Sequence, residues 1–195
     1  MSQSLIIFRT LAKATLCTSL LLVGCAEKIT DERDGQKYSV IKIADKLWFA
    51  ENLNFETGNS SCPEGDNRNC SKYGRLYTRD DALRACPSGW RLPDNLEINE
   101  LVKAAGGMSK AGDALKSSSG WFKKGNGSDA LGFAAQPAGY WSQGKFDGIG
   151  GYAYFWSSTD SEDGLAYYLF LDFSSKGATL NAFDKESARS VRCVK

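Results

Sequence analysis

The chain of 195 residues contains no histidine, and this absence removes several classes of enzyme. A Ser-His-Asp or Cys-His nucleophile needs an imidazole as its base, and many hydrolytic metal centres use imidazole ligands. Any catalysis would have to use carboxylates, Lys, Tyr or Cys. We therefore predict that the protein is not an enzyme, with no catalytic residue, no metal ligand and no cofactor.

The N-terminal region lacks an apolar run long enough to cross a membrane. The uncharged run at residues 14–26 falls short of the roughly 20 residues that a spanning helix needs. Arg9 and Lys13 precede it, and it closes with LLVGC. This order is typical of a secretory signal, and LLVGC resembles the lipobox of bacterial lipoproteins. Residues 1–24 are thus predicted to be a signal peptide, and Cys25 the first mature residue, carrying diacylglycerol and an acyl chain such as palmitate.

Several acyl chains on one residue form a lasting membrane anchor. Ala26 after the lipidated cysteine resembles the sorting signal of outer-membrane lipoproteins, and the acidic residues that follow favour display at the cell surface. The protein is therefore expected in the bacterial envelope, at the outer membrane, with the membrane as a partner through its lipid. The sequence leaves two faces open for the domain, the cell surface and the inward-facing side. Residues 25–34 are polar apart from Ile29 and are predicted to be a flexible tether.

No cluster of basic residues is present that would recruit nucleic acid. The 24 Lys and Arg residues face 23 Asp and Glu residues and are interspersed with them, as in the C-terminal ESARSVRCVK. A phosphate-binding surface needs clustered cations, whereas this pattern is typical of a solvated mixed surface. We expect no nucleic-acid partner.

Four of the six cysteines remain once the signal peptide and the lipidated residue are set aside. An even set in an exported chain indicates disulfides, and no CxxC spacing supports zinc. Three pairings are possible. We favour the one that closes the polar loop CPEGDNRNC and ties the middle of the chain to its end, a long closure that contributes about 4 to 5 kcal/mol in the chain-entropy model. A Cys62 to Cys193 linkage would overturn this choice. The predicted disulfides are Cys62–Cys70 and Cys86–Cys193.

Residues 35–195 are predicted to form one domain. Polar and apolar residues alternate in KYSVIKI, which indicates a half-buried strand, and LWFAENLN completes a hairpin with it. Residues 56–72 are a polar excursion held by the short disulfide. Further strands are expected, within a loop-rich second half, at residues 133–139, 154–159, 165–173, 178–183 and 190–195.

Two capping-box patterns predict short amphipathic helices. Thr78 with Asp81 opens the first helix, which ends near Cys86 because a proline follows. Asp94 with Glu97 opens the second, which stops at a pair of glycines. The fold class is therefore α+β, with two short helices packed on a small, mostly antiparallel, loop-rich sheet.

Five separated motifs carry a resemblance. They are DGQKYSVIKIADKLWFAENLNF, YGRLYTRDDALRACPSGWRLPD, LGFAAQPAGY, FWSST and the terminal SVRCVK. In order and wording they resemble the Fibrobacter succinogenes major paralogous domain, over nearly all of residues 30–195. Such domains are similar to the C-type lectin-like superfamily. That resemblance implies that the first and last strands lie side by side and that a disulfide joins a helix to the last strand.

The motif residues are expected to build the fold and not to bind a ligand. The strings QPAG and WSST, where calcium-dependent lectins carry carboxylates, supply too few of them for a cation, so a calcium-type sugar site is not expected. Trp48, Trp90 and Trp156 are predicted core residues, Arg91 and Glu97 a structural ion pair, and Asn52 a partner of buried backbone groups.

Ligand binding is assigned instead to aromatic-rich segments on the predicted surface loops, WFKKGNGSDA and GYWSQGKFDGIGGYAY. Rings there can stack on the apolar faces of sugars while polar neighbours bond hydroxyls. The competing interpretation is that most of these rings are core. The predicted ligand-binding residues are Trp121, Tyr140, Trp141, Gln143, Lys145, Asp147 and Tyr152, with Phe146 and Tyr154 beside them.

These observations favour a non-catalytic, lectin-like binding module for a glycan or for cell-surface adhesion. One alternative is an envelope structural or assembly protein that binds another protein with the same loops. A second is a carboxylate-based glycosidase, which needs only two acids at about 5 to 10 Å, such as Asp147 with Asp160 or Glu162.

Overall fold

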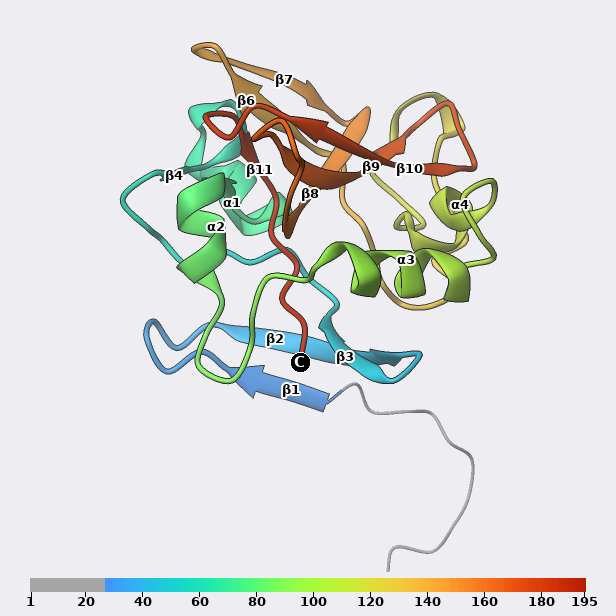
Figure 1. The fold of residues 1–195 in the computed structure, drawn as a ribbon, viewed down its shortest axis with the longest axis horizontal. Coiled ribbons are helices and arrows are strands. Elements are labelled where there is room, and N and C mark those ends of the chain that lie inside the picture. The colour runs from blue at the N-terminus through green and yellow to red at the C-terminus, as the bar shows by residue number, and fades with distance from the viewer. Residues whose placement is uncertain (1–26) are drawn as a thin grey trace, which may run out of the picture.

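The computed structural model describes residues 27–195, and these form two sheets with a helix between them (Figure 1). The predicted signal peptide and the lipid-bearing Cys25 lie outside the described residues. No helix within residues 27–195 is long and apolar enough to cross a membrane.

The small sheet has three antiparallel strands in the order β1-β2-β3. The predicted hairpin is confirmed, and Val40 and Ile43 of its first strand are buried in two different hydrophobic clusters. The three strands are β1 (Glu27–Thr30), β2 (Lys37–Ile43) and β3 (Lys46–Phe49).

The prediction of a flexible tether is wrong for the described part of that segment. Strand β1 pairs with β2 in register from Glu27 opposite Val40. Asp31 is fully buried, and its carboxylate accepts a hydrogen bond from the Arg33 guanidinium at 2.7 Å. The same guanidinium donates to the Ala85 carbonyl at 2.7 Å. A four-residue edge strand with one apolar side chain produces no periodic signal, so its pairing was invisible in the sequence.

The large sheet has the order β10-β9-β8-β6-β11-β5-β4, and β7 pairs with β6. Its pairings are antiparallel except between β6 and β8. The strands are β4 (Ser60–Ser61), β5 (Leu76–Thr78), β6 (Ala138–Ser142), β7 (Lys145–Ile149), β8 (Tyr152–Asp160), β9 (Ala166–Asp172), β10 (Ala178–Phe183) and β11 (Ala188–Arg189).

Both predicted helices form. At the second, the Asp94 carboxylate accepts from the Glu97 amide at 2.9 Å and Glu97 accepts from the Asp94 amide at 3.0 Å, which confirms the capping box. At the first, Thr78 makes no side-chain cap, and Asp81 accepts instead from the Asn59 amide at 2.7 Å, so that capping box was wrong. The helices are α1 (Asn67–Tyr73), α2 (Arg79–Ala85), α3 (Asn95–Ala104) and α4 (Ala111–Leu115), with 3-10 turns η1 (Pro63–Gly65) and η2 (Phe122–Lys124).

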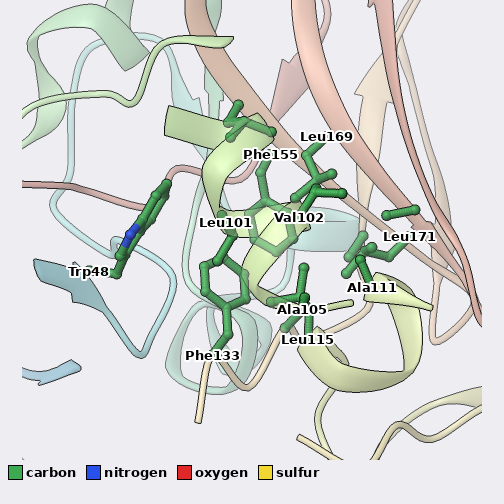
Figure 2. Close-up of a cluster of buried hydrophobic side chains, with 14 of the residues drawn as sticks. Trp48, Leu101, Val102, Ala105, Ala111, Leu115, Phe133, Phe155, Leu169 and Leu171 are labelled. Carbon is green, nitrogen blue, oxygen red and sulfur yellow. The ribbon is translucent and has the colours of Figure 1, made fainter. Parts of the chain in front are cut away.

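Helix α3 fills the space between the two sheets (Figure 1). Its Leu101 and Val102 pack with Phe155 and Leu169 of the large sheet and with Trp48 of the small one, as Figure 2 shows. Trp156 is likewise buried, which confirms two of the predicted core tryptophans, and Trp90 is half-buried.

The expected structural ion pair is present. Arg91 donates to Glu97 with two contacts of 2.6 Å. Burial alone would raise the pKa of Glu97, but hydrogen bonds from Arg91 and the Asp94 amide outweigh it and lower the pKa.

The C-terminal segment lies beside β3 without forming a regular strand. Leu47 and Lys195 exchange backbone hydrogen bonds of 3.0 and 2.9 Å, and the Phe49 amide donates to the Cys193 carbonyl at 3.0 Å. The C-terminus accordingly ends next to β3 (Figure 1). Both predicted disulfides, Cys62–Cys70 and Cys86–Cys193, are present.

Arg192 explains why the strand expected at residues 133–139 is mostly absent. This side chain is 1% exposed, and it donates to the carbonyl groups of Phe133 and Ala134. It also donates to the Asn52 side chain at 2.7 Å and to the Phe49 carbonyl at 3.1 Å, and Asn52 in turn donates to the Tyr73 carbonyl at 2.7 Å. The carbonyl groups of Phe133 and Ala134 therefore accept hydrogen bonds from the Arg192 guanidinium and not from a neighbouring strand. The predicted role of Asn52 as a partner of buried backbone groups is confirmed.

Candidate functional site

The candidate site begins with a tight hairpin between β6 and β7. The loop residues Gln143 and Gly144 both have positive φ, 50° and 81°. Two such residues form a turn whose twist matches the flanking strands. At the base of the hairpin Gly139 also has positive φ, and a Cβ there would overlap the Asp147 carbonyl oxygen. The hairpin thus depends on a glycine at each end.

The pairing register decides which side chains share a face. Tyr140 lies opposite Asp147, and Ser142 lies opposite Lys145. Residues two apart on a strand, and residues directly opposite each other, point to the same face of a sheet. Four polar side chains therefore stand together on one face of the hairpin.

These side chains line an open groove of about 530 Å³. Phe183 at the end of β10 closes one wall, and 42% of its surface is exposed. Figure 1 places β6, β7, β10 and β11 at the end of the molecule away from the small sheet. The groove is lined by Tyr140, Ser142, Gln143, Lys145, Phe146, Asp147 and Phe183.

The structure thus brings four predicted ligand-binding residues together, namely Tyr140, Gln143, Lys145 and Asp147. It does not add Trp121 to them. The prediction of a surface ring at Trp121 is wrong, since the side chain is 6% exposed. Its indole nitrogen donates to the Ser117 hydroxyl at 3.1 Å and the Ala135 carbonyl at 3.2 Å, as expected for a satisfied core tryptophan.

Trp141 and Tyr152 also lie away from the groove. Trp141 follows Tyr140 on the strand and points to the other face, where it packs with Leu76 and Ala188. Tyr152 is half-buried in an aromatic cluster, with its ring centroid 6.3 Å from that of Tyr154.

This cluster continues from the groove wall into the sheet. The ring of Tyr140 lies 5.0 Å from that of Tyr154, which in turn lies 4.8 Å from Phe170. Burial raises the pKa of the Tyr154 hydroxyl well above its ordinary value, so the hydroxyl stays neutral. The groove therefore has a neutral aromatic wall.

Arg189 of β11 lies within this cluster, and sequence reasoning missed it. The centre of its guanidinium is 4.2 Å from the Tyr168 ring, 4.7 Å from Trp156 and 5.1 Å from Tyr154. Burial lowers the pKa of Arg189 to about 10, so the side chain is still protonated at neutral pH. In the sequence it stood among mixed charges and was interpreted as surface, because no local pattern reports that five rings converge on one cation.

A second hollow, of about 370 Å³, lies beside β2 and the end of α1 and was also missed. Its amide side chains are largely engaged by the protein. Gln36 donates to the Asp34 carboxylate at 2.6 Å and to the Asn54 carbonyl at 3.1 Å, and Asn54 donates back to Gln36 at 3.0 Å. The groove on the hairpin keeps more of its polar groups free for a ligand.

One of the acids considered for a glycosidase, Asp160, has a lowered pKa. Asp160 is held by Lys185 and Arg79, each at 2.8 Å, and the hydrogen bond from Lys185 first of all lowers its pKa. A general acid needs a raised pKa. Asp147 accepts from the Gly148 amide at 2.6 Å. Within residues 27–195, no three His, Cys, Asp or Glu side chains gather as a metal site would require.

Comparison with known proteins gives one match. The family model of the Fibrobacter succinogenes major domain matches residues 41–195, which run from within β2 to the C-terminus and include the large sheet and the groove. No curated protein and no solved structure matches the chain.

Proposed function

The chain belongs to the Fibrobacter succinogenes major domain family, and on that premise we propose that it is a non-catalytic binding module that holds a glycan in the β6–β7 groove. One observation carries the proposal. Four residues chosen from the sequence for sugar binding line a single open groove together with an exposed ring.

The groove has the chemistry that a saccharide needs. Phe183 and Tyr140 offer ring surface to the apolar face of a sugar, while Gln143, Lys145 and Asp147 offer donors and acceptors to its hydroxyls. Because the groove is shallow and open, it suits a chain that passes through it better than an enclosed small molecule.

The proposal includes an outer-membrane lipoprotein anchored through Cys25. Strand β1 begins at Glu27 in the small sheet, so a lipid two residues earlier attaches at that end of the domain. The β6–β7 hairpin, whose residues line the groove, lies at the end of the molecule opposite the small sheet (Figure 1). This arrangement supports a role in holding an external glycan or in adhesion.

A C-type lectin-like fold is part of the same proposal. The C-terminal segment beside β3 and the disulfide from Cys86, which follows α2, to Cys193 are both features that the superfamily resemblance implies.

The test uses the full chain purified from membranes in detergent and immobilised cell-wall glycans. We expect wild-type protein to be retained and Phe183→Ala to bind up to about tenfold more weakly, the loss expected of one stacked ring. Phe122→Ala removes a ring that is 55% exposed outside the groove and serves as the matched control. Equal retention of the three proteins would contradict the proposed site. Capture of one stoichiometric envelope protein with no glycan retention would instead establish the assembly alternative.

A further inference from the structure

Three arginines in the described part of the chain are almost fully buried, and one of them stands apart. Arg79 is paired with Asp160 at 2.8 Å, and Arg192 donates to four oxygen acceptors. Arg189 is equally buried, with 2% of its surface exposed. Within residues 27–195 its guanidinium has neither an ion pair nor a hydrogen bond, and its Nε is fully enclosed without a partner. It is a buried cation that lacks an anion.

Five aromatic rings take the place of that anion. Besides the three rings already described, those of Phe183 and Tyr140 lie 5.3 and 5.9 Å from the guanidinium centre. Ring faces attract a cation but accept no strong hydrogen bonds, so the N–H donors of the guanidinium remain available. Neither of the two nearest acids along the chain, Glu186 and Asp184, forms an ion pair with Arg189, and the Asp184 carboxylate accepts from the Glu186 amide at 2.9 Å.

Two of the five rings are also walls of the groove. The guanidinium lies against these two rings, 5.3 Å from Phe183 and 5.9 Å from Tyr140, and Phe183 is the only one of the five rings that is exposed. Of the guanidinium nitrogens only Nε is fully enclosed without a partner, so the two Nη atoms, which form no hydrogen bond within the described residues, keep some contact with solvent. Lys145 adds a second positive charge on the groove rim, against the single carboxylate of Asp147.

We propose that the groove selects an acidic saccharide, a uronic-acid residue whose carboxylate accepts hydrogen bonds from the Nη atoms of Arg189 while its sugar ring stacks on Phe183. This inference rests on the proposed function and names the ligand class for the same site. Paired donors of a guanidinium match the two oxygens of a carboxylate, and the bond is stronger where water is excluded. The aromatic cluster holds the guanidinium in place before the ligand arrives, which reduces the ordering that binding requires.

The test compares two probes that differ only in charge. Full-length protein in detergent is titrated with oligogalacturonate and with the same oligosaccharide after its carboxyl groups have been reduced to alcohols. We expect wild-type protein to bind the acidic form at least tenfold more tightly, with a difference that shrinks as salt is raised. In Arg189→Met we expect that difference to fall to about threefold, the share left to Lys145, while affinity for the reduced form is kept. Arg84→Met removes an exposed arginine from α2 and is the matched control, expected to behave as wild type.

Two further measurements keep the test independent of how Arg189→Met folds. The NMR signal of the Arg189 Nε–H group should shift with oligogalacturonate and not with the reduced form. Lys145→Ala, a substitution on the exposed rim, should weaken binding of the acidic form by about threefold, as expected for one rim charge.

The outcomes separate the two proposals. Equal affinity of wild-type protein for both oligosaccharides overturns the selection of acidic sugars and leaves glycan binding intact. An acidic preference that Arg189→Met retains undiminished also overturns it. Binding of neither probe, with the Nε–H signal unmoved, overturns both proposals. Tighter binding of a polyglutamate peptide than of oligogalacturonate would identify an acidic protein segment as the ligand and would overturn the saccharide.

Discussion

Arg192 and Arg189 lie three residues apart in the C-terminal segment, are equally buried and are used in opposite ways. Arg192 donates to the Asn52 side chain and to three backbone carbonyls, so each acceptor around it is satisfied by its charge. Arg189 has five rings around it, and its side chain donates no hydrogen bond within the described residues. The protein itself supplies all the acceptors for the Arg192 guanidinium, whereas the Arg189 guanidinium would gain its acceptors from a bound anion. The comparison teaches that a buried charge serves the fold when the chain supplies its partners, and points to a ligand when it does not.

The largest loss of stability is expected when Arg192 is replaced. Replacing it with Met leaves four buried acceptors without a donor, each at a cost of about 1–3 kcal/mol. We expect the free energy of unfolding to fall by about 4 kcal/mol or more, measured by urea denaturation. A loss below about 1 kcal/mol would show that Arg192 does not hold the segments around it.

The contribution of the C-terminal segment to stability can also be measured through its disulfide, because Cys193 directly follows Arg192 and is bonded to Cys86. The Cys86–Cys193 bond closes a loop of 107 residues, against 8 for Cys62–Cys70. In the chain-entropy model, Ala substitution of both cysteines lowers the free energy of unfolding by about 4.7 kcal/mol for Cys86–Cys193 and by about 2.5 kcal/mol for Cys62–Cys70. Thermal unfolding of the two double variants measures the difference, and the reverse order would contradict this account.

Stability at low pH depends on carboxylates and not on the two arginines, because Arg189 and Arg192 both stay protonated in acid. The hydrogen bonds from Arg33 lower the pKa of Asp31, and the balance described above lowers that of Glu97. A carboxylate whose pKa is lower in the folded state contributes stability that is present above its unfolded pKa and is lost as pH falls through the folded value. Unfolding midpoints in urea should therefore decline from about pH 4.5 downward. Asn substitution at position 31 should make the decline shallower, and an unchanged slope would show that this pair is not responsible.

Arg189 gives the smallest expected effect on stability. Arg189→Met removes an unpaired buried charge and also its contacts with the rings, and these two changes oppose each other. The free energy of unfolding should change by no more than about 1 kcal/mol, in contrast to Arg192→Met. Differential scanning calorimetry of the two variants makes the comparison directly, and similar losses would end the distinction between them.

Much of the frame could be predicted from the sequence because its signals are local. The alternation of KYSVIKI, the capping box at Asp94 and the polar loop between Cys62 and Cys70 each depend on a few consecutive residues. The missed elements have no such signal. Strand β1 depends on its partner β2, and helices α1 and α4 are too short to show a period of 3.6 residues.

The candidate site also has a part that could be predicted from local sequence and a part that could not. The hairpin residues Tyr140, Gln143, Lys145 and Asp147 are close in sequence, so a local choice brought most of the groove together. Trp121 looked equivalent by composition, but its burial is decided by residues far along the chain. The environment of Arg189 comes from β6, β8, β9 and β10, and only the assembled sheet reveals it.

The most direct test measures binding and stability on one variant. For Arg189→Met, the account predicts at least a tenfold loss of affinity for oligogalacturonate with an unfolding midpoint close to that of wild-type protein. Unchanged affinity, or a midpoint lowered as far as that of Arg192→Met, would contradict the claim that Arg189 serves a ligand and Arg192 the fold.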